Sequence, residues 1–147
     1  MPVDARVDKA AALFAEGFSC SQAVFLGFAE ELGLDSATAF KLSQAFGGGM
    51  AHLGQVCGAV TGAFMAISLK HGRSEVNDLA ARDRTYERMQ RLAELFKRRH
   101  GSLDCPSLIG VDLATEEGRA ESKAKDLART RCAGFVRTAA ELTAEIL

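Results

Sequence analysis

The chain has 147 residues, of which 48% are hydrophobic and 25% charged, and this composition is usual for one globular domain. A formal net charge of -1 gives no electrostatic reason to expect nucleic acid or an anionic membrane surface as a partner. The first residues are charged and resemble no secretory signal, and no run reaches the ~18 apolar residues of a membrane span. We therefore expect one cytoplasmic domain over residues 1–147, in which stable disulfides are unusual.

Apolar residues recur at helical spacing along the whole sequence, and no strand pattern or internal repeat is present. Ser19, followed three residues later by Gln22, forms a capping-box pattern that predicts a helix start and puts Cys20 in the first turn. Pro106 suits the first position of a short helix, so we expect Cys105 to be its N-cap. Longer helices are predicted over residues of about 7–16, 20–32, 36–46, 54–70, 74–100, 113–127 and 130–146.

The helix expected from about Gly54 to Lys70 is apolar on nearly every side, which indicates a buried central helix. Gly54, Gly58 and Gly62 lie four residues apart and would share one face, where a backbone or a bulky ligand could approach closely. The run of glycines at 47–49 should break the chain before this helix. We thus predict an all-α, single-domain bundle of about six helices around a Gly-rich central helix.

The helix over residues 74–100 has one apolar stripe and many charges on its other side. We expect this stripe to be the inner face of the helix. It consists of Leu79, Tyr86, Met89, Ala93 and Phe96.

Four cysteines are separated by 37, 48 and 27 positions, so no CxxC pair exists. This spacing excludes the thioredoxin motif and the zinc-ribbon pattern. Each cysteine lies near a predicted helix start, where the helix dipole favours thiolate over thiol, and Arg129 and Arg131 would add to this effect at Cys132. Four unconnected buried thiols remain the alternative. The cysteines are Cys20, Cys57, Cys105 and Cys132.

The segment GGGMAHLGQVCGAVTGAFMAISLKHG has GFSCSQAV upstream, and DCPSLIG and RCAGFV downstream. Together these segments resemble the C-GCAxxG-C-C family, whose members are described as redox-active proteins. The resemblance extends from about Gly17 to the C-terminus, and the central motif reads Cys57-Gly58-Ala59-x-x-Gly62, with Val56 before the cysteine. It implies that the four cysteines are the characteristic ones, and that the protein has a redox role with a prosthetic group such as an iron–sulfur cluster. Some members carry a twin-arginine export signal, whereas Arg98-Arg99 here is internal.

The leading hypothesis is an iron–sulfur electron carrier or oxidoreductase component. Cys20, Cys57, Cys105 and Cys132 would be its ligands, and Gly54, Gly58 and Gly62 would leave room for the cluster. The alternatives are metal-free thiol–disulfide exchange, a structural zinc site, and a helical interaction module with incidental cysteines. No motif for hydrolysis or phosphoryl transfer occurs, so the sequence does not decide whether the protein is an enzyme.

Partner expectations follow from the same resemblance. We expect an oxidoreductase or a transporter-associated redox protein as the partner, and the apolar helices are compatible with a homodimer.

His52, in the Gly-rich loop, is an alternative ligand or proton carrier. His71 and His100 are expected at helix ends, where a cation suits the helix dipole.

Overall fold

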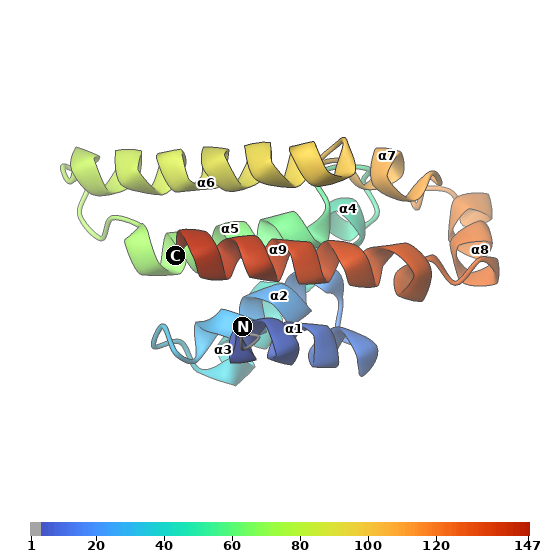
Figure 1. Ribbon diagram of the computed structural model, residues 1–147, viewed down its shortest axis with the longest axis horizontal. Helices are drawn as coiled ribbons and strands as arrows, with labels where there is room; N and C mark the ends of the chain where they lie inside the picture. The colour runs from blue at the N-terminus through green and yellow to red at the C-terminus, as the bar shows by residue number, and fades with distance from the viewer. Residues whose placement is uncertain (1–3) are drawn as a thin grey trace.

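The computed structural model describes residues 4–147, and these fold into helices joined by short connections (Figure 1). No β-strand forms within this range, which confirms the predicted all-α class. None of the described helices is both long enough and apolar enough to cross a membrane. The helices are α1 (Ala5–Ala15), α2 (Cys20–Ala29), α3 (Ser36–Leu42), the 3-10 turn η1 (Gln44–Phe46), α4 (Gly47–Ala51), α5 (Gly58–His71), α6 (Leu79–His100), α7 (Cys105–Ile109), α8 (Glu116–Ala124), the π-helical turn η2 (Ala128–Cys132) and α9 (Ala133–Ile146).

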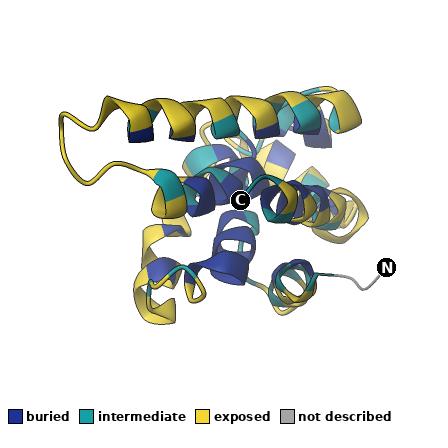
Figure 2. Cartoon of the chain, turned by 60° about the vertical axis from the view of Figure 1, so that its left-hand side comes forward, coloured by how far each residue is buried: buried dark blue, intermediate teal, exposed yellow. Residues whose placement is uncertain are grey.

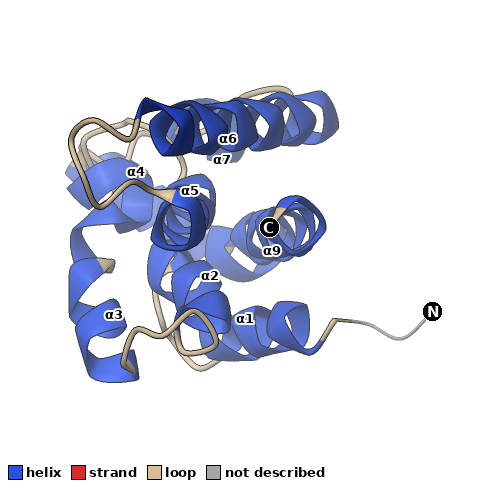
Figure 3. Ribbon diagram, turned by 90° about the vertical axis from the view of Figure 1, so that its left-hand side faces the viewer, coloured by secondary structure: helices blue, strands red, loops and turns tan. Residues whose placement is uncertain are grey.

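Helices α2 and α5 form the centre of the molecule and are the most deeply buried (Figure 2). They pack closely because Gly62 faces α2: a Cβ at this position would lie 2.7 Å from the Ser21 carbonyl oxygen. Gly27 plays the same part between α2 and α1, since a Cβ there would lie 2.9 Å from the Arg6 carbonyl oxygen. In Figure 3, α3 lies on one side of α2, and α1 and α9 lie on the other. The predicted buried, Gly-rich central helix is therefore present.

Side-chain caps set the helix starts that the sequence indicates. The Gln22 amide nitrogen donates to Ser19 Oγ at 3.3 Å, and the Ser19 amide nitrogen donates to Gln22 Oε1 at 3.1 Å, which confirms the capping box. Asp35 caps α3 by accepting a hydrogen bond from the Thr38 amide at 2.9 Å. Such caps each stabilise a helix by about 1 kcal/mol.

The inner face predicted for α6 is partly wrong. Leu79 and Tyr86 are 51% and 55% exposed, while Phe96 is fully buried. The stripe that faces α5 and α9 is rotated and includes Thr85, whose hydroxyl donates to the Ala81 carbonyl at 2.8 Å. Because the helix backbone itself satisfies this hydroxyl, a threonine can occupy the core side. Leu79 and Tyr86 are left on the exposed side.

The glycines at 47–49 do not simply break the chain. They begin α4, where Gly48 and Gly49 have φ of 65° and 72° and the left-handed conformation continues through Met50, Ala51 and His52. A left-handed conformation costs roughly 1–2 kcal/mol for each residue other than glycine. Hydrogen bonds hold the turn closed, from the His52 amide to the Gly48 carbonyl at 3.1 Å and from the Gln55 amide to the Gly49 carbonyl at 2.9 Å.

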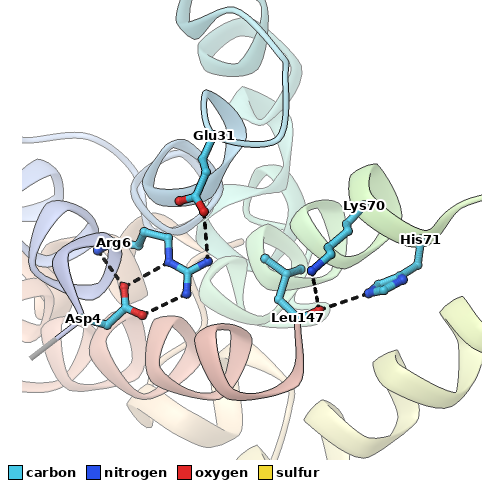
Figure 4. Close-up of polar contacts among 6 residues, drawn as sticks. All are labelled: Asp4, Arg6, Glu31, Lys70, His71 and Leu147. Carbon is cyan, nitrogen blue, oxygen red and sulfur yellow. Dashed lines mark hydrogen bonds and ion pairs between the residues drawn. The ribbon is translucent and has the colours of Figure 1, made fainter.

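Figure 4 shows polar contacts near the two ends of the chain. The Arg6 guanidinium pairs with Asp4 at 2.9 Å and lowers the pKa of that carboxyl to about 2. The Lys70 ammonium, at the end of α5, donates to the Leu147 carbonyl oxygen beyond α9 at 2.7 Å.

Candidate four-cysteine site

A short antiparallel pairing brings two of the cysteines together. Val56 and Asp104 form an isolated β-bridge, in which the Cys57 amide donates to the Leu103 carbonyl at 2.7 Å and the Cys105 amide donates to the Gln55 carbonyl at 2.8 Å. In such a pairing Cys57 and Cys105 are diagonal neighbours on the same face. The bridge also explains why α5 begins at Gly58 and not at the predicted Gly54 or Gln55, since the preceding residues are extended.

Each of these cysteines lies at a helix start, as predicted. Cys57 is the N-cap residue of α5, but its side chain makes no capping hydrogen bond. Cys105 is the first residue of α7, and Asp104 is the N-cap, because its carboxylate accepts a hydrogen bond from the Ser107 amide at 2.9 Å. The prediction that Cys105 is the cap was therefore wrong by one residue, since a carboxylate is a far better acceptor than a thiol.

Cys20 is the first residue of α2, as the capping box predicts. Its sulfur occupies the space beside Gly58, where an added Cβ would overlap Cys20 Sγ. The backbone amides of Gly48, Ser21 and Gly58 act on this thiol to favour the thiolate. The left-handed turn and the start of α5 thus both approach the same sulfur.

Cys132 directly precedes α9, as predicted, but this helix start is not free. It ends the π-helical turn η2 and continues directly into α9 with helical φ and ψ, so the preceding turn already uses the backbone donors. The expected help from neighbouring arginines is also absent. Arg129 pairs with Asp126 at 2.6 Å, and Arg131 donates to the Leu108 carbonyl at 3.3 Å.

The four thiols interact electrostatically with one another. Burial is the largest cause of a raised pKa at each, and repulsion from the ionised form of Cys20 is the second cause at Cys57, Cys105 and Cys132. The pKa rises to about 11 at Cys105 and to about 12 at Cys132, and it rises further at Cys57. Like charges shift a pKa strongly within roughly 4–6 Å. Cys20 is thus near enough to each of the other three cysteines to raise its pKa, although the four come from separate segments.

These pKa shifts overturn the expectation that helix starts would favour thiolates. The backbone amides do act in that direction at Cys20 and Cys57, but the cost of burying a charge is larger. Cys20 is partly exposed as a residue, yet burial dominates its pKa, which indicates that its sulfur lies in the interior. In the free protein all four cysteines are therefore thiols at neutral pH.

The glycines around the site accommodate the cysteines themselves. Gly58 makes room for Cys20, and Gly49 makes room for Cys105, whose Cβ would lie 2.7 Å from a Cβ at position 49. Gly62 serves the contact between α2 and α5. Gly54 lies in a turn with φ of 71°, so the prediction that Gly54, Gly58 and Gly62 share one helix face is wrong for Gly54. Gly49 was not predicted as a site residue, although the run of glycines at 47–49 marks an unusual backbone at this position.

The other candidate residues, His52 and Thr61, are not linked to the cysteines in this way. His52 is exposed and packs over Gly48, and it is not among the groups that shift the pKa of any cysteine. Thr61 donates to the Gly58 carbonyl at 3.1 Å, as a threonine in a helix commonly does. Within residues 4–147 the cysteines are free of disulfides, and no three or more His, Cys, Asp or Glu residues are arranged to hold one metal ion.

These features define an all-helical protein in which four cysteines from distant segments influence one another electrostatically. Residues 18–146 match the family described as "Putative redox-active protein (C_GCAxxG_C_C)". The chain belongs to this family, which confirms the resemblance seen in its motifs. No curated protein and no solved structure matches the chain.

Proposed function

We propose that this redox-active protein carries electrons through an iron–sulfur cluster bound by Cys20, Cys57, Cys105 and Cys132. The supporting observation is that Cys20 lies against Gly58 at the start of α5, directly after Cys57, and that the β-bridge puts Cys105 on the same face as Cys57. Cys132 is near enough to Cys20 for the charge of that residue to raise its pKa. Four thiolates are the usual ligand set of such clusters, and the ligands need not be close in sequence when the fold brings them together. When bound, the cluster would supply one-electron transfer.

The chemistry of the donor set fits this group. The four side chains offer only sulfur, and hydrogen bonds from nearby amides are a recognised means of tuning clusters. The amides of Gly48 and Gly58 face Cys20 and are available for this role. Each thiol would release its proton on binding metal, so loading should require neutral or mildly basic solution.

A structural zinc ion fits less well. Zinc needs four sulfurs at about 2.3 Å from one point. The described residues contain no group arranged in that way. A four-iron cluster would take one cysteine on each iron, so its four ligands could be further apart than those of zinc.

Thiol–disulfide exchange is the second candidate, because Cys57 and Cys105 lie on one face of the β-bridge. Diagonal neighbours of this kind have Cα atoms about 7–8 Å apart. A disulfide usually needs about 4.4–6.8 Å, so a bond here would require the backbone to move. We therefore rank exchange below cluster binding.

The setting of the proposed activity follows from the family. We propose a cytoplasmic protein that exchanges electrons with an oxidoreductase or a transporter-associated redox protein. The small net charge of -1 gives such a partner little long-range electrostatic attraction, so recognition would depend on contacts near the site.

The test is anaerobic reconstitution with iron and sulfide, followed by measurement of bound iron, acid-labile sulfide and visible absorbance. We expect colour in the wild type and at least a tenfold loss of iron in Cys57→Ser, with the helical circular dichroism retained. Ala124→Ser, on the exposed side of α8, is the matched control and should load like the wild type. The serine hydroxyl at position 57 should lower the free energy of unfolding by about 1–3 kcal/mol.

Other results of the reconstitution experiment would favour the alternative functions. Wild-type protein that stays colourless and iron-free after reconstitution would refute cluster binding. Loss of two hydrogens on mild oxidation, seen by mass spectrometry, would then favour exchange, and stoichiometric zinc would favour a structural site. A protein in which all four cysteines tolerate serine without any loss would be an interaction module.

A further inference from the structure

The four cysteines are not all held in place by the same kind of contact. The β-bridge fixes Cys105 beside Cys57 through two backbone hydrogen bonds, and Cys20 lies against Gly58, the residue after Cys57. Within residues 4–147, no backbone hydrogen bond of this kind joins Cys132 to the segments of the other three, because Cys132 ends η2, beyond α8. A different contact must therefore hold the segment of Cys132.

The side chain of Arg131 makes such a contact. Its guanidinium donates to the Leu108 carbonyl oxygen at 3.3 Å. Leu108 lies in α7, three residues after Cys105, whereas Arg131 directly precedes Cys132. In Figure 1, α7 and the start of α9 lie at the same end of the molecule. Among the described residues this is the one side-chain hydrogen bond that joins α7 to η2 or α9.

The Leu108 carbonyl needs a donor from outside its own helix. Because α7 ends at Ile109, its last carbonyl groups have no amide partner within the helix. Leu108 is only 4% exposed, and a buried carbonyl without a donor costs about as much free energy as a lost hydrogen bond. Arginine side chains commonly bind the last carbonyl groups of a helix. The Arg131 side chain is therefore held at Leu108 by the needs of α7.

The two arginines of η2 have different partners. The Ala133 amide donates to the Ala128 carbonyl, five residues back, so this turn is π-helical. Arg129 pairs with Asp126 at 2.6 Å and stays within its own segment, whereas Arg131 reaches α7. Single π-helical turns are rare and occur frequently at functional sites.

We infer that Arg131 is the positioning residue for Cys132, and that its hydrogen bond to the Leu108 carbonyl holds Cys132 near Cys105. The inference rests on the proposed four-cysteine site and names a residue that serves it. The role of Arg131 is positional, because its charge is not among the causes of the raised pKa at Cys132. Repulsion from the ionised form of Cys105 is among those causes, so the two cysteines are close enough to interact.

Alkylation of the reduced, metal-free protein with iodoacetamide tests the inference, with each cysteine followed by peptide mass spectrometry. Arg131→Met removes the donor and keeps an apolar stem, so Cys132 should react at least about threefold faster, as the loss of one hydrogen bond allows. Cys57 should keep its rate and is the internal reference. Arg129→Met is the matched control, because it removes the same charge from the same turn without touching α7. Arg131→Lys restores a donor and should return the rate toward that of the wild type.

Iron retention gives a second readout after anaerobic reconstitution. We expect Arg131→Met to lose iron to a chelator about tenfold faster than the wild type, as for other residues that orient metal ligands, and Arg129→Met to match the wild type. Should Arg131→Met fail to fold by circular dichroism, Arg131→Gln decides, since its shorter side chain does not reach Leu108.

Three results would overturn the inference: an unchanged alkylation rate at Cys132 in Arg131→Met, an equal increase in Arg129→Met, or an equal increase at Cys57. The alkylation comparison does not need a cluster. A wild type that binds no iron would therefore refute the proposed function alone, whereas an unchanged Cys132 in a protein that does bind iron would refute only the role of Arg131.

Discussion

Replacing Gly58 by alanine tests the idea that this glycine makes room for a cysteine. The new Cβ would overlap Cys20 Sγ and lie 3.0 Å from both the Gly47 Cα and the Phe46 carbonyl oxygen. Two of these three atoms belong to the backbone, so they move only at a cost. Either the backbone shifts, or Cys20 rotates and its sulfur leaves the group of four.

The expected change in the free energy of unfolding for Gly58→Ala is the difference between two opposing effects. Overpacking of this kind costs about 1–3 kcal/mol. Alanine is favoured over glycine in a helix by up to about 1 kcal/mol. With two contacts to backbone atoms the first effect should be near its upper limit, which leaves a net loss of about 2 kcal/mol. For a chain of this size the melting temperature should fall by about 4–8 °C.

The assay is urea unfolding followed by circular dichroism under reducing conditions, with Gly134→Ala as the matched control. Gly134 lies in α9 and has nothing within 4 Å of an added Cβ, so the same substitution should stabilise the protein by about 0.5–1 kcal/mol. Gly58→Ala should also load less iron, because any relaxation moves Cys20. Equal stability of the two variants, with full iron loading of Gly58→Ala, would refute the reasoning.

Two further predictions concern strain and pH. Ala51 has a φ of 54°, so Ala51→Gly should stabilise the protein by about 0.5 kcal/mol in urea unfolding. The control Ala12→Gly, in the regular helix α1, should destabilise it by about 1 kcal/mol. A change of the same sign in both variants would contradict a strained turn. Burial, and then the Arg99 charge, lower the pKa of His100 below 6.5, so the unfolded chain binds the proton more readily. The contribution of His100 to the free energy of unfolding should therefore be constant above about pH 6.5 and decline as the pH drops from there through the lowered pKa. His100→Gln should flatten that decline in urea titrations, and an unchanged slope would contradict the assignment.

The two histidines show that the position of a residue along a helix does not by itself determine its pKa. His71 and His100 do lie at the ends of α5 and α6, as the sequence predicts. Burial nevertheless lowers the pKa of both, and His100 packs its ring against Phe96 and Phe135 at 4.9 Å between centroids. The helix dipole is a local property that a sequence displays, whereas burial depends on which helices later pack together.

The same distinction separates the predicted helices from the unpredicted turn. Capping boxes and apolar periodicity are encoded within a few residues, so α2, α3 and the buried α5 could be predicted. The bridge between Val56 and Asp104 joins residues far apart in the chain, and without it the start of α5 cannot be located. The left-handed conformation of Met50, Ala51 and His52 could not be predicted, because neither methionine nor alanine favours it.

The strained turn bears on what the four cysteines do. Strained backbone persists only where the surroundings enforce it, and such places are frequent at functional sites. Here the turn carries Gly48, whose amide faces Cys20, and Gly49, against which Cys105 packs. Left-handed conformation at three residues other than glycine costs several kcal/mol, so the surrounding packing must enforce it. The strain therefore supports the proposal that Cys20 and Cys105 belong to a functional site, and this support does not depend on the family match.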